Sequence, residues 1–438
     1  MKRFTVTPNA WVPLVLSVLL LFAGGNARAD IVGETGTGAT GAPEFHLKAS
    51  PGYISTSDGD SLLMWGYSLI AREQMQYPGP TLIVNEGDLV TVTLINYLPS
   101  SPDYVPNVSI VFPGHVVTAS GGVPGVITHE APPDDGSTVV TYQFTATHPG
   151  TYLYRSGSRP DLQVEMGLVG ALIVRPTDET GAVIPNQAYD HPDTAYDHEF
   201  LYLLTEMDPV IHRQVEYRQY SRIDTSRYFA TNWFINGRNF PDLMAANNVP
   251  WLPTQPYNCQ PIMNVGDRVL IRCIGAGREL HPMHFHGNDF ETIAADGRVL
   301  TSGSGAPDLS WQATTIKFVP GQTADLIWSW NAANLGWDIY GHAPGDPMVT
   351  GEFEDDHGKP FPVVLPTRDS LSYGEFYSGT PYIGESGDLP PGHPGLNDLG
   401  GFLYMWHSHT EKELTSNDIW PGGLVSFMIV VHPDMAHP

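Results

Sequence analysis

The chain is poor in cysteine and in basic residues, and each shortage excludes a class of protein. Among 438 residues there are 2 Cys, and 21 Lys and Arg stand against 47 Asp and Glu, which gives a formal charge of −26. Nucleic-acid binding requires a basic surface that neutralises phosphates, so this balance argues against nucleic acid as a partner. Two Cys cannot form a disulfide framework, and a chain of this length can bury a core without one.

Charged residues of both signs together are also few, at 16%, while aromatic residues reach 11%. This composition is typical neither of a disordered chain nor of a coiled coil. The chain is instead rich in Gly (45) and Pro (39), and both residues weaken the interior of a helix. We therefore expect an all-β protein with many turns, and the length suggests roughly two to three domains of about 100–200 residues.

The N-terminal apolar run is too short for a membrane-spanning helix, which needs about 20 residues. It covers 13 residues, 11–23, follows a Lys-Arg pair at 2–3 and precedes Ala-Arg-Ala at 27–29. These features predict a signal peptide over residues 1–29 and a mature start near Asp30. We expect no membrane span elsewhere, and a soluble protein that is periplasmic or secreted.

Strand patterns recur along the chain. Residues 81–96 and 261–274 each predict two strands about a Gly-Asp turn, and the strand patterns at 150–174 recur at 401–430. Two similar β-units are the simplest interpretation. The expected organisation is a first unit over residues 30–176, a linker over 177–197, and a second unit over 198–438 with an insertion at about 340–400.

The two cysteines allow two interpretations. Cys259 and Cys273 lie on either side of the Gly-Asp turn at 266–267. In a simple hairpin they would lie opposite each other, within reach of a disulfide. If the chain changes sheets at Gly266, they would be two separate buried thiols.

The insertion contains one acidic run, Glu-Phe-Glu-Asp-Asp-His at 352–357. Its carboxylates could hold a hard cation. The commoner interpretation of such a run is a solvated loop, and long insertions are usually surface loops or lids.

Two histidine clusters stand out among 17 His. The first is His-Pro-Met-His-Phe-His-Gly at 281–287, and the second is His-Ser-His at 407–409. Residues i and i+2 of a strand share a face, so each His-x-His presents two imidazoles side by side. Two such pairs facing each other would form a nitrogen site suited to copper or zinc. The alternative is two polar His pairs on a solvent-exposed face.

Taken in order, these motifs resemble the multicopper oxidases, the cupredoxin-fold family that includes laccases. The resemblance implies two cupredoxin-like Greek-key β-sandwich domains, copper as cofactor and oxidoreductase activity. It is carried by residues 77–88, 150–154, 281–287 and 407–409.

The resemblance also implies a role for each histidine of the two clusters. His281 matches a type 1 copper ligand and His284 a type 2 ligand. His286, His407 and His409 match ligands of the paired type 3 coppers. All five are therefore candidate metal ligands.

The chain departs from this family in its first domain. Val111-Phe112-Pro113-Gly114 stands where the family carries His-x-His-Gly, and Arg155-Ser156-Gly157 stands where it carries His-Ser-His. The internal repeat agrees, because 111–114 align with 284–287. Val, Pro and Gly offer no side-chain donor, and a charged Arg would repel copper.

The type 1 copper position also departs from the family pattern. Ser408 stands in place of the cysteine, Glu413 in place of a later histidine, and Leu424 at the weak axial position. A hydroxyl cannot replace a soft thiolate. Of the type 1 ligands, only His281 remains.

The expected function is that of an exported copper-binding protein resembling multicopper oxidases, with a reduced, His-only site. One copper ion is favoured over four, zinc is an alternative metal, and standard laccase activity is not expected. A second hypothesis is an oxidoreductase whose missing ligands come from a different subunit in a hetero-complex. A homo-oligomer cannot supply them, because every copy has the same residues.

A metal-free scaffold is a third hypothesis. A fourth is a simpler reaction on one metal, for which the sequence indicates no substrate.

Overall fold

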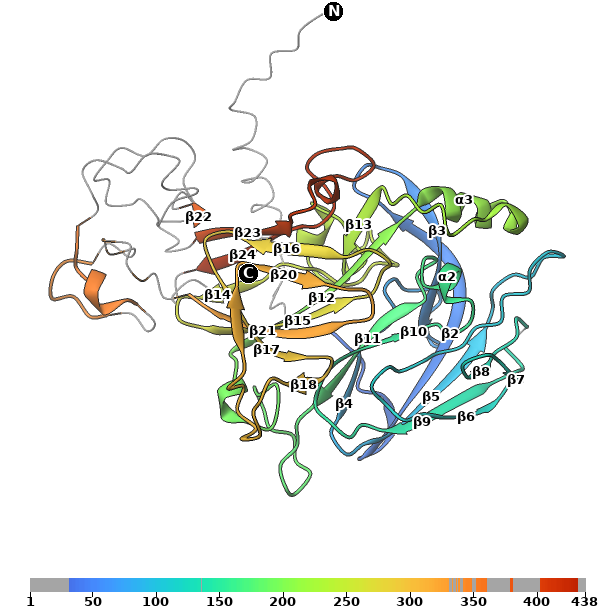
Figure 1. The fold of residues 1–438 in the computed structure, drawn as a ribbon, viewed down its shortest axis with the longest axis horizontal. Helices are drawn as coiled ribbons and strands as arrows, with labels where there is room; N and C mark the ends of the chain where they lie inside the picture. Colours follow the sequence, from blue (N-terminus) through green and yellow to red (C-terminus); the bar gives the residue numbers. More distant parts are fainter. Residues whose placement is uncertain are drawn as a thin grey trace, which may run out of the picture.

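The structure, a computed structural model, describes residues 31–134, 136–330, 333, 336, 338, 342–348, 352–360, 379–380 and 402–431. The signal peptide expected at 1–29 and much of the insertion expected at 340–400 lie outside the described residues. Figure 1 shows two β-sandwich units side by side, the first coloured blue to teal and the second mainly yellow to red. The expectation of an all-β protein is confirmed.

The first unit contains two sheets and a short hairpin. The larger sheet has the order β1 (Thr37–Ala39), β2 (Ala42–Ser55), β5 (Leu89–Asn96), β9 (Val140–Thr145), β6 (Thr118–Gly121), with β3 (Ser61–Leu69) paired to β2. The smaller sheet has the order β10 (Gly150–Arg155), β11 (Val169–Arg175), β4 (Leu82–Asn85), and the hairpin joins β7 (Val123–Pro124) to β8 (His129–Glu130). In β9, Val140, Tyr142 and Phe144 are buried and alternate with more exposed residues, as expected for a strand with one face on a core.

The described part of the second unit also contains two sheets. One has the order β13 (Asn232–Ile235), β12 (His198–Met207), β15 (Arg268–Gly275), β21 (Thr323–Ser329), β17 (Phe290–Ala295), β18 (Arg298–Val299), with β19 (Trp311–Ala313) paired to β17. The other has the order β14 (Ile262–Asn264), β24 (Val425–Val431), β23 (Phe402–Ser408), β16 (His281–Phe285), β20 (Thr315–Phe318), with β22 (Gly379–Thr380) paired to β23. Aromatic side chains fill the space between the sheets. Phe285 stacks on Phe290 with ring centroids 4.5 Å apart, and Trp406 packs on Tyr202 at 4.2 Å.

Helices are short and few among the described residues, and none of them is long and apolar enough to cross a membrane. They are α2 (Pro160–Gln163), η2 (Pro192–Thr194), α3 (Pro209–Glu216), η3 (Tyr220–Arg222), η4 (Asp242–Met244), η5 (Glu354–Asp356) and η6 (Glu411–Leu414).

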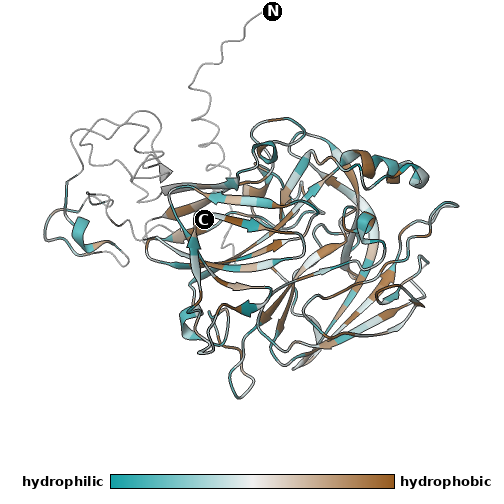
Figure 2. Cartoon of the chain, viewed as in Figure 1, coloured by the Kyte–Doolittle hydropathy of each residue, from teal (hydrophilic) through white to brown (hydrophobic). Residues whose placement is uncertain are grey.

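Helix α3 shows how a short segment becomes helical here. Asp208 caps its N-terminus by accepting a hydrogen bond from Val210 N at 2.9 Å, and Pro209 occupies the first turn. Ile211 and Val215, on one face, pack into the core of the first unit, and Figure 2 shows both hydrophobic and hydrophilic residues on the helix. The helix follows β12 of the second unit in the chain but packs against the first unit. Because one segment thus contacts both units, the domain boundaries expected from the sequence remain a prediction.

The repeat seen in the sequence corresponds to equivalent strand pairs. The turns between β4 and β5 and between β14 and β15 contain Gly87 and Gly266, with φ of 86° and 85°, a conformation that favours glycine. After each glycine comes an Asp, Asp88 or Asp267, whose carboxylate accepts a hydrogen bond of 2.7 Å from the backbone N three residues earlier.

The two strands of each repeat enter different sheets, so neither pair is a simple hairpin. The chain changes sheets at Gly266, between β14 and β15. Cys259 and Cys273 are accordingly two free, buried thiols. The second interpretation of the cysteines is therefore confirmed.

A buried ion network joins the two units. The guanidinium of Arg272 on β15 contacts Glu199 of β12 at 3.0 Å and Asp325 of β21 at 3.8 Å, and donates a hydrogen bond to the hydroxyl of Thr151 on β10 at 3.1 Å. Arg175 of β11 also binds Glu199, at 2.6 Å. Burial favours the neutral acid, but the two arginines outweigh it and lower the pKa of Glu199 to about 2.

Replacing Arg272 should therefore destabilise the protein strongly. Arg272→Met leaves Glu199 and Asp325 buried without their shared cation, and we expect a loss of about 3–5 kcal/mol in the free energy of unfolding. Urea unfolding measures this change. The matched control is Arg213→Met, which removes the exposed pair with Asp60 and should cost less than about 1 kcal/mol. Equal losses in the two variants would contradict a structural role for the network.

Candidate metal centre

The two histidine motifs lie on neighbouring antiparallel strands. β16 pairs with β23 so that His284 is directly opposite His407 and Met283 is opposite Ser408. Backbone hydrogen bonds extend this pairing past both strand ends, from His286 N to Met405 O at 3.0 Å and from His409 N to Pro282 O at 2.7 Å. Alternation along the strands then gives the motif residues two different faces.

Four of the five candidate ligands meet on the outer face. We call His284, His286, His407 and His409 the histidine patch; their contacting rings have centroids 4.7 to 5.8 Å apart. The Nε2 atoms of His286 and His407 are 2.8 Å apart. The facing His pairs expected from sequence are thus brought together.

Three rings of the patch are held in place through Nδ1. His284 Nδ1 bonds the hydroxyl of Thr315 at 2.9 Å, and His409 Nδ1 bonds a carboxylate oxygen of Glu411 at 3.2 Å. His407 Nδ1 donates to the carbonyl oxygen of Ser408 at 2.8 Å. A neutral imidazole that donates from Nδ1 keeps a lone pair on Nε2, so this arrangement leaves Nε2 able to bind a metal.

The patch also favours neutral rings. Burial, followed by the charges of neighbouring histidines, lowers the pKa of His286 to about 4 and also lowers the pKa of His284. Burial lowers the pKa of His407 despite its bond to the Ser408 carbonyl. These rings are therefore unprotonated at neutral pH, which metal binding requires.

His281 lies on the opposite, inner face of β16, apart from the patch. It is fully buried, and both ring nitrogens face carboxylates: Nδ1 lies 2.9 Å from Glu413 Oε2, and Nε2 lies 2.9 Å from Glu206 Oε2. Burial alone would lower its pKa, but the two carboxylates outweigh burial and raise the pKa of His281 to about 9. His281 is therefore an imidazolium at neutral pH, and neither nitrogen has a free lone pair.

The residues around His281 complete a buried hydrogen-bonded cluster. Ser408 donates its hydroxyl hydrogen to Glu413 Oε2 at 2.5 Å. Glu206 Oε1 accepts hydrogen bonds from the backbone N of Arg278 and of Glu279. Glu206 comes from β12, and no motif in the sequence indicated it, because only the packing of the two sheets brings it to His281.

The first unit has the same local geometry with different side chains. Val111 forms an antiparallel bridge with Arg155, with backbone hydrogen bonds of 2.8 and 3.2 Å. This bridge corresponds to the pairing of His284 with His407. Phe112 is buried, as Phe285 is in the second unit. The repeat alignment made from sequence therefore agrees with the register, and neither bridge residue supplies an imidazole.

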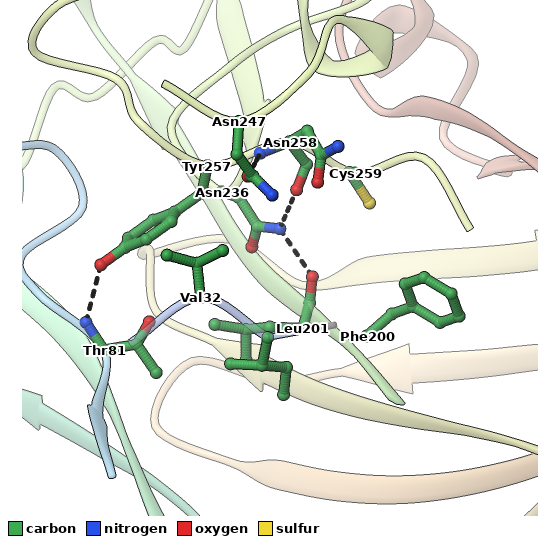
Figure 3. Close-up of a pocket in the computed structure, with 10 residues that line it drawn as sticks. Val32, Thr81, Phe200, Leu201, Asn236, Asn247, Tyr257, Asn258 and Cys259 are labelled. Carbon is green, nitrogen blue, oxygen red and sulfur yellow. Dashed lines mark hydrogen bonds between the residues drawn. The ribbon is translucent and has the colours of Figure 1, made fainter. Parts of the chain in front are cut away.

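A small pocket lies away from all these residues, where the two units meet (Figure 3). Its polar groups bond one another: the Thr81 backbone N donates to Tyr257 Oη at 2.9 Å, and Asn236 Nδ2 donates to the carbonyls of Leu201 and Asn258 at 2.6 and 2.8 Å. None of the predicted site residues lines it. These bonds hold loops together, and we assign the pocket no chemistry.

Comparison with known proteins adds independent information. Residues 69–179 match the family model of multicopper oxidases. Over 106 residues the chain is 38% identical to multicopper oxidase MCE of Talaromyces pinophilus, a match that covers 24% of this chain and 16% of that protein. Over 121 residues it is 33% identical to a copper-containing nitrite reductase of Pseudomonas chlororaphis, covering 27% of this chain and 30% of that protein. The matches thus span less than a third of these relatives.

A solved structure matches over most of the chain. The blue copper oxidase of Nitrosomonas europaea superimposes with a TM-score of 0.53 over 89% of this chain and 86% of that one, at 19% identity. The expected cupredoxin-like fold is thereby confirmed. Residues 69–179 are thus similar in sequence to multicopper oxidases, and the chain as a whole has a cupredoxin-like fold.

The residues expected at the type 1 copper position of this family lie together in the core. Ser408 N donates to the Leu424 carbonyl at 3.1 Å, and Leu424 N donates to the Glu413 carbonyl at 2.8 Å. These residues do not fit a type 1 copper, since Ser408 offers no thiolate and both nitrogens of His281 already face carboxylates. The histidine patch fits copper better, with four imidazoles and no competing carboxylate between His286 and His407.

The His281 cluster should make stability depend on pH on the alkaline side. The folded pKa of His281, about 9, lies above the ordinary value of about 6.5, so its stabilising contribution is complete below about pH 6.5 and lost as pH rises through 9. We expect the free energy of unfolding to fall across this window by on the order of 3 kcal/mol. Urea unfolding at a series of pH values measures it.

His281→Gln is the control for this measurement. Glutamine can bond both carboxylates but does not titrate, so the variant should be less stable near pH 6 and should lack the decline between pH 6.5 and 9. Parallel pH profiles in the two proteins would refute the assignment of a protonated His281.

Proposed function

We propose that this protein binds a copper ion through the histidine patch and that it does not carry out the standard laccase reaction. The observation that carries the proposal is the convergence of four imidazoles from β16 and β23, three of them fixed through Nδ1. Imidazole nitrogen is a preferred ligand of copper and also suits zinc. A single copper ion is the occupant we favour, with zinc as the alternative metal.

The residues at the expected type 1 position support the second half of the proposal. Laccase-type chemistry requires an electron-storing type 1 copper, and Ser408 supplies no thiolate for it. In the first unit, the Val111–Arg155 bridge stands where a further pair of imidazoles would be needed, and Arg155 adds a positive charge. A bound copper would supply Lewis acidity at the patch, while Thr315, Glu411 and the Ser408 carbonyl would orient its ligands.

Loading the protein with Cu(II) and assaying its activity would also distinguish two other functions, an oxidase completed by a partner subunit and a metal-free scaffold. A hetero-complex that supplied the missing ligands would give oxidase activity only with the partner subunit present. A metal-free scaffold would bind no copper at the patch. A homo-oligomer adds nothing to the ligand set, because each copy carries Val111 and Arg155.

The copper proposal predicts a specific stoichiometry and spectrum. After loading with Cu(II) and dialysis, the wild-type chain should retain one more copper ion than the His284→Ala/His407→Ala variant, measured by metal analysis. The intense blue band should be absent, since it arises from a copper–thiolate bond. Thr315→Val, which removes the partner of His284, should weaken copper binding by about 10–100-fold.

His46→Ala is the matched control, because His46 is an exposed histidine of the first unit outside the patch. It should leave copper binding unchanged. Equal copper content in wild type and the double variant would refute binding at the patch. A blue band or oxidase activity in the pure chain would refute the reduced site.

We also propose that the protein is exported to the periplasm or secreted. The supporting features are the Lys-Arg pair at 2–3, the apolar run at 11–23 and the Ala-Arg-Ala site at 27–29. On expression of the full chain in a Gram-negative bacterium, N-terminal sequencing of the periplasmic or secreted protein should give a start near Asp30. Accumulation in the cytoplasm with residues 1–29 retained would contradict export.

A further inference from the structure

A second group of histidines and carboxylates lies around η5, the orange coil at the left of Figure 1. It consists of Asp338, His342, Glu352 and His357. One ligand atom from each residue lies within 4.8 Å of all the others. The sequence indicated only the carboxylates within 352–357 as candidates for a cation, whereas the structure adds Asp338 and His342 from an earlier segment.

The four ligand atoms face one another closely. His357 Nδ1 lies 2.7 Å from Glu352 Oε1 and 3.4 Å from Asp338 Oδ2. His342 Nδ1 lies 3.1 Å from the same Asp338 oxygen and 3.4 Å from the same Glu352 oxygen. Each nitrogen therefore points at both carboxylates.

The hydrogen bonding of His357 fixes the role of each of its ring nitrogens. Its Nε2 lies 2.9 Å from the carbonyl oxygen of Asp346, so Nε2 must donate. In a neutral ring, Nδ1 then carries a lone pair, and that lone pair faces the Glu352 carboxylate. Two acceptors at this distance repel unless a proton or a metal cation lies between them. A proton on His357 serves one nitrogen, whereas a metal ion serves both imidazoles and both carboxylates at once.

The two carboxylates of the cluster are buried. The side chain of Asp338 is 0% exposed and that of Glu352 is 4% exposed. One oxygen of each carboxylate lies within 4.8 Å of the other. Like charges in a poorly hydrated place repel strongly, and a divalent cation relieves that repulsion. His342 and His357 are slightly more exposed, at 18% and 15%, so they form the side through which an ion would enter.

We propose that Asp338, His342, Glu352 and His357 form a second metal site, which binds one divalent transition-metal ion of the zinc type. Two imidazoles with two carboxylates form a donor set that suits zinc, whereas calcium and magnesium prefer oxygen ligands alone. The ion joins Asp338 and His342 to Glu352 and His357. The site shares no residue with the histidine patch and does not depend on it.

The test is zinc binding in a chain whose patch is removed. The full-length His284→Ala/His407→Ala protein should bind one Zn²⁺ per chain in a calorimetric titration, while Ca²⁺ should bind far more weakly. Adding His342→Ala or His357→Ala should lower the affinity for Zn²⁺ by at least about 10–100-fold. His191→Ala, which removes a histidine near a different carboxylate, Asp193, should leave zinc binding unchanged.

Circular dichroism establishes that each variant is folded. If one histidine variant does not fold, Asp338→Asn, which keeps the size of the side chain but removes its charge, takes its place. Zinc affinity equal to that of the parent in the folded variants would overturn the proposal, and so would Ca²⁺ binding as tight as Zn²⁺ binding. Because the patch is absent from every protein in this experiment, neither result bears on copper binding at the patch.

Discussion

The pairing of β16 with β23 is the constraint on which the site depends. It fixes His284 opposite His407, and strand alternation then sends His281 and Ser408 to the core and the patch residues to the outer face. A slip of one residue would exchange the two faces, so the register that packs Phe285 into the aromatic core also assembles the patch. The Val111–Arg155 bridge keeps this register in the first unit without any imidazole, which indicates that packing alone is sufficient to maintain it.

The two faces use histidine in opposite ways. On the core face, Glu206 and Glu413 hold His281 as a cation, and the hydroxyl of Ser408 supports one of those carboxylates. A charged, fully bonded ring contributes to folding and has no lone pair for a metal. On the outer face, burial and mutual repulsion keep the rings of His286 and His407 neutral, which leaves nitrogen lone pairs available.

Much of the fold and part of the site could be predicted from the sequence. The turns at Gly87 and Gly266, the β-rich composition and the grouping of His284 with His407 follow from local patterns, and the structure agrees with each of them. The sequence left open whether Cys259 and Cys273 pair, because the answer depends on which sheet each strand joins. It did not point to Glu206, because a glutamate within a buried strand carries no local pattern that identifies its partner.

The sequence by itself determined which side chains share a strand face, because that depends only on the two-residue period of a strand. It therefore indicated the His-x-His pairs and the lack of a thiolate at Ser408. Only the tertiary structure decided which charges meet: Glu206 with His281, Arg272 with Glu199, and Asp338 and His342 with Glu352 and His357. Such contacts join residues from separate strands or loops, and the energy of a buried charge depends on all the groups packed around it.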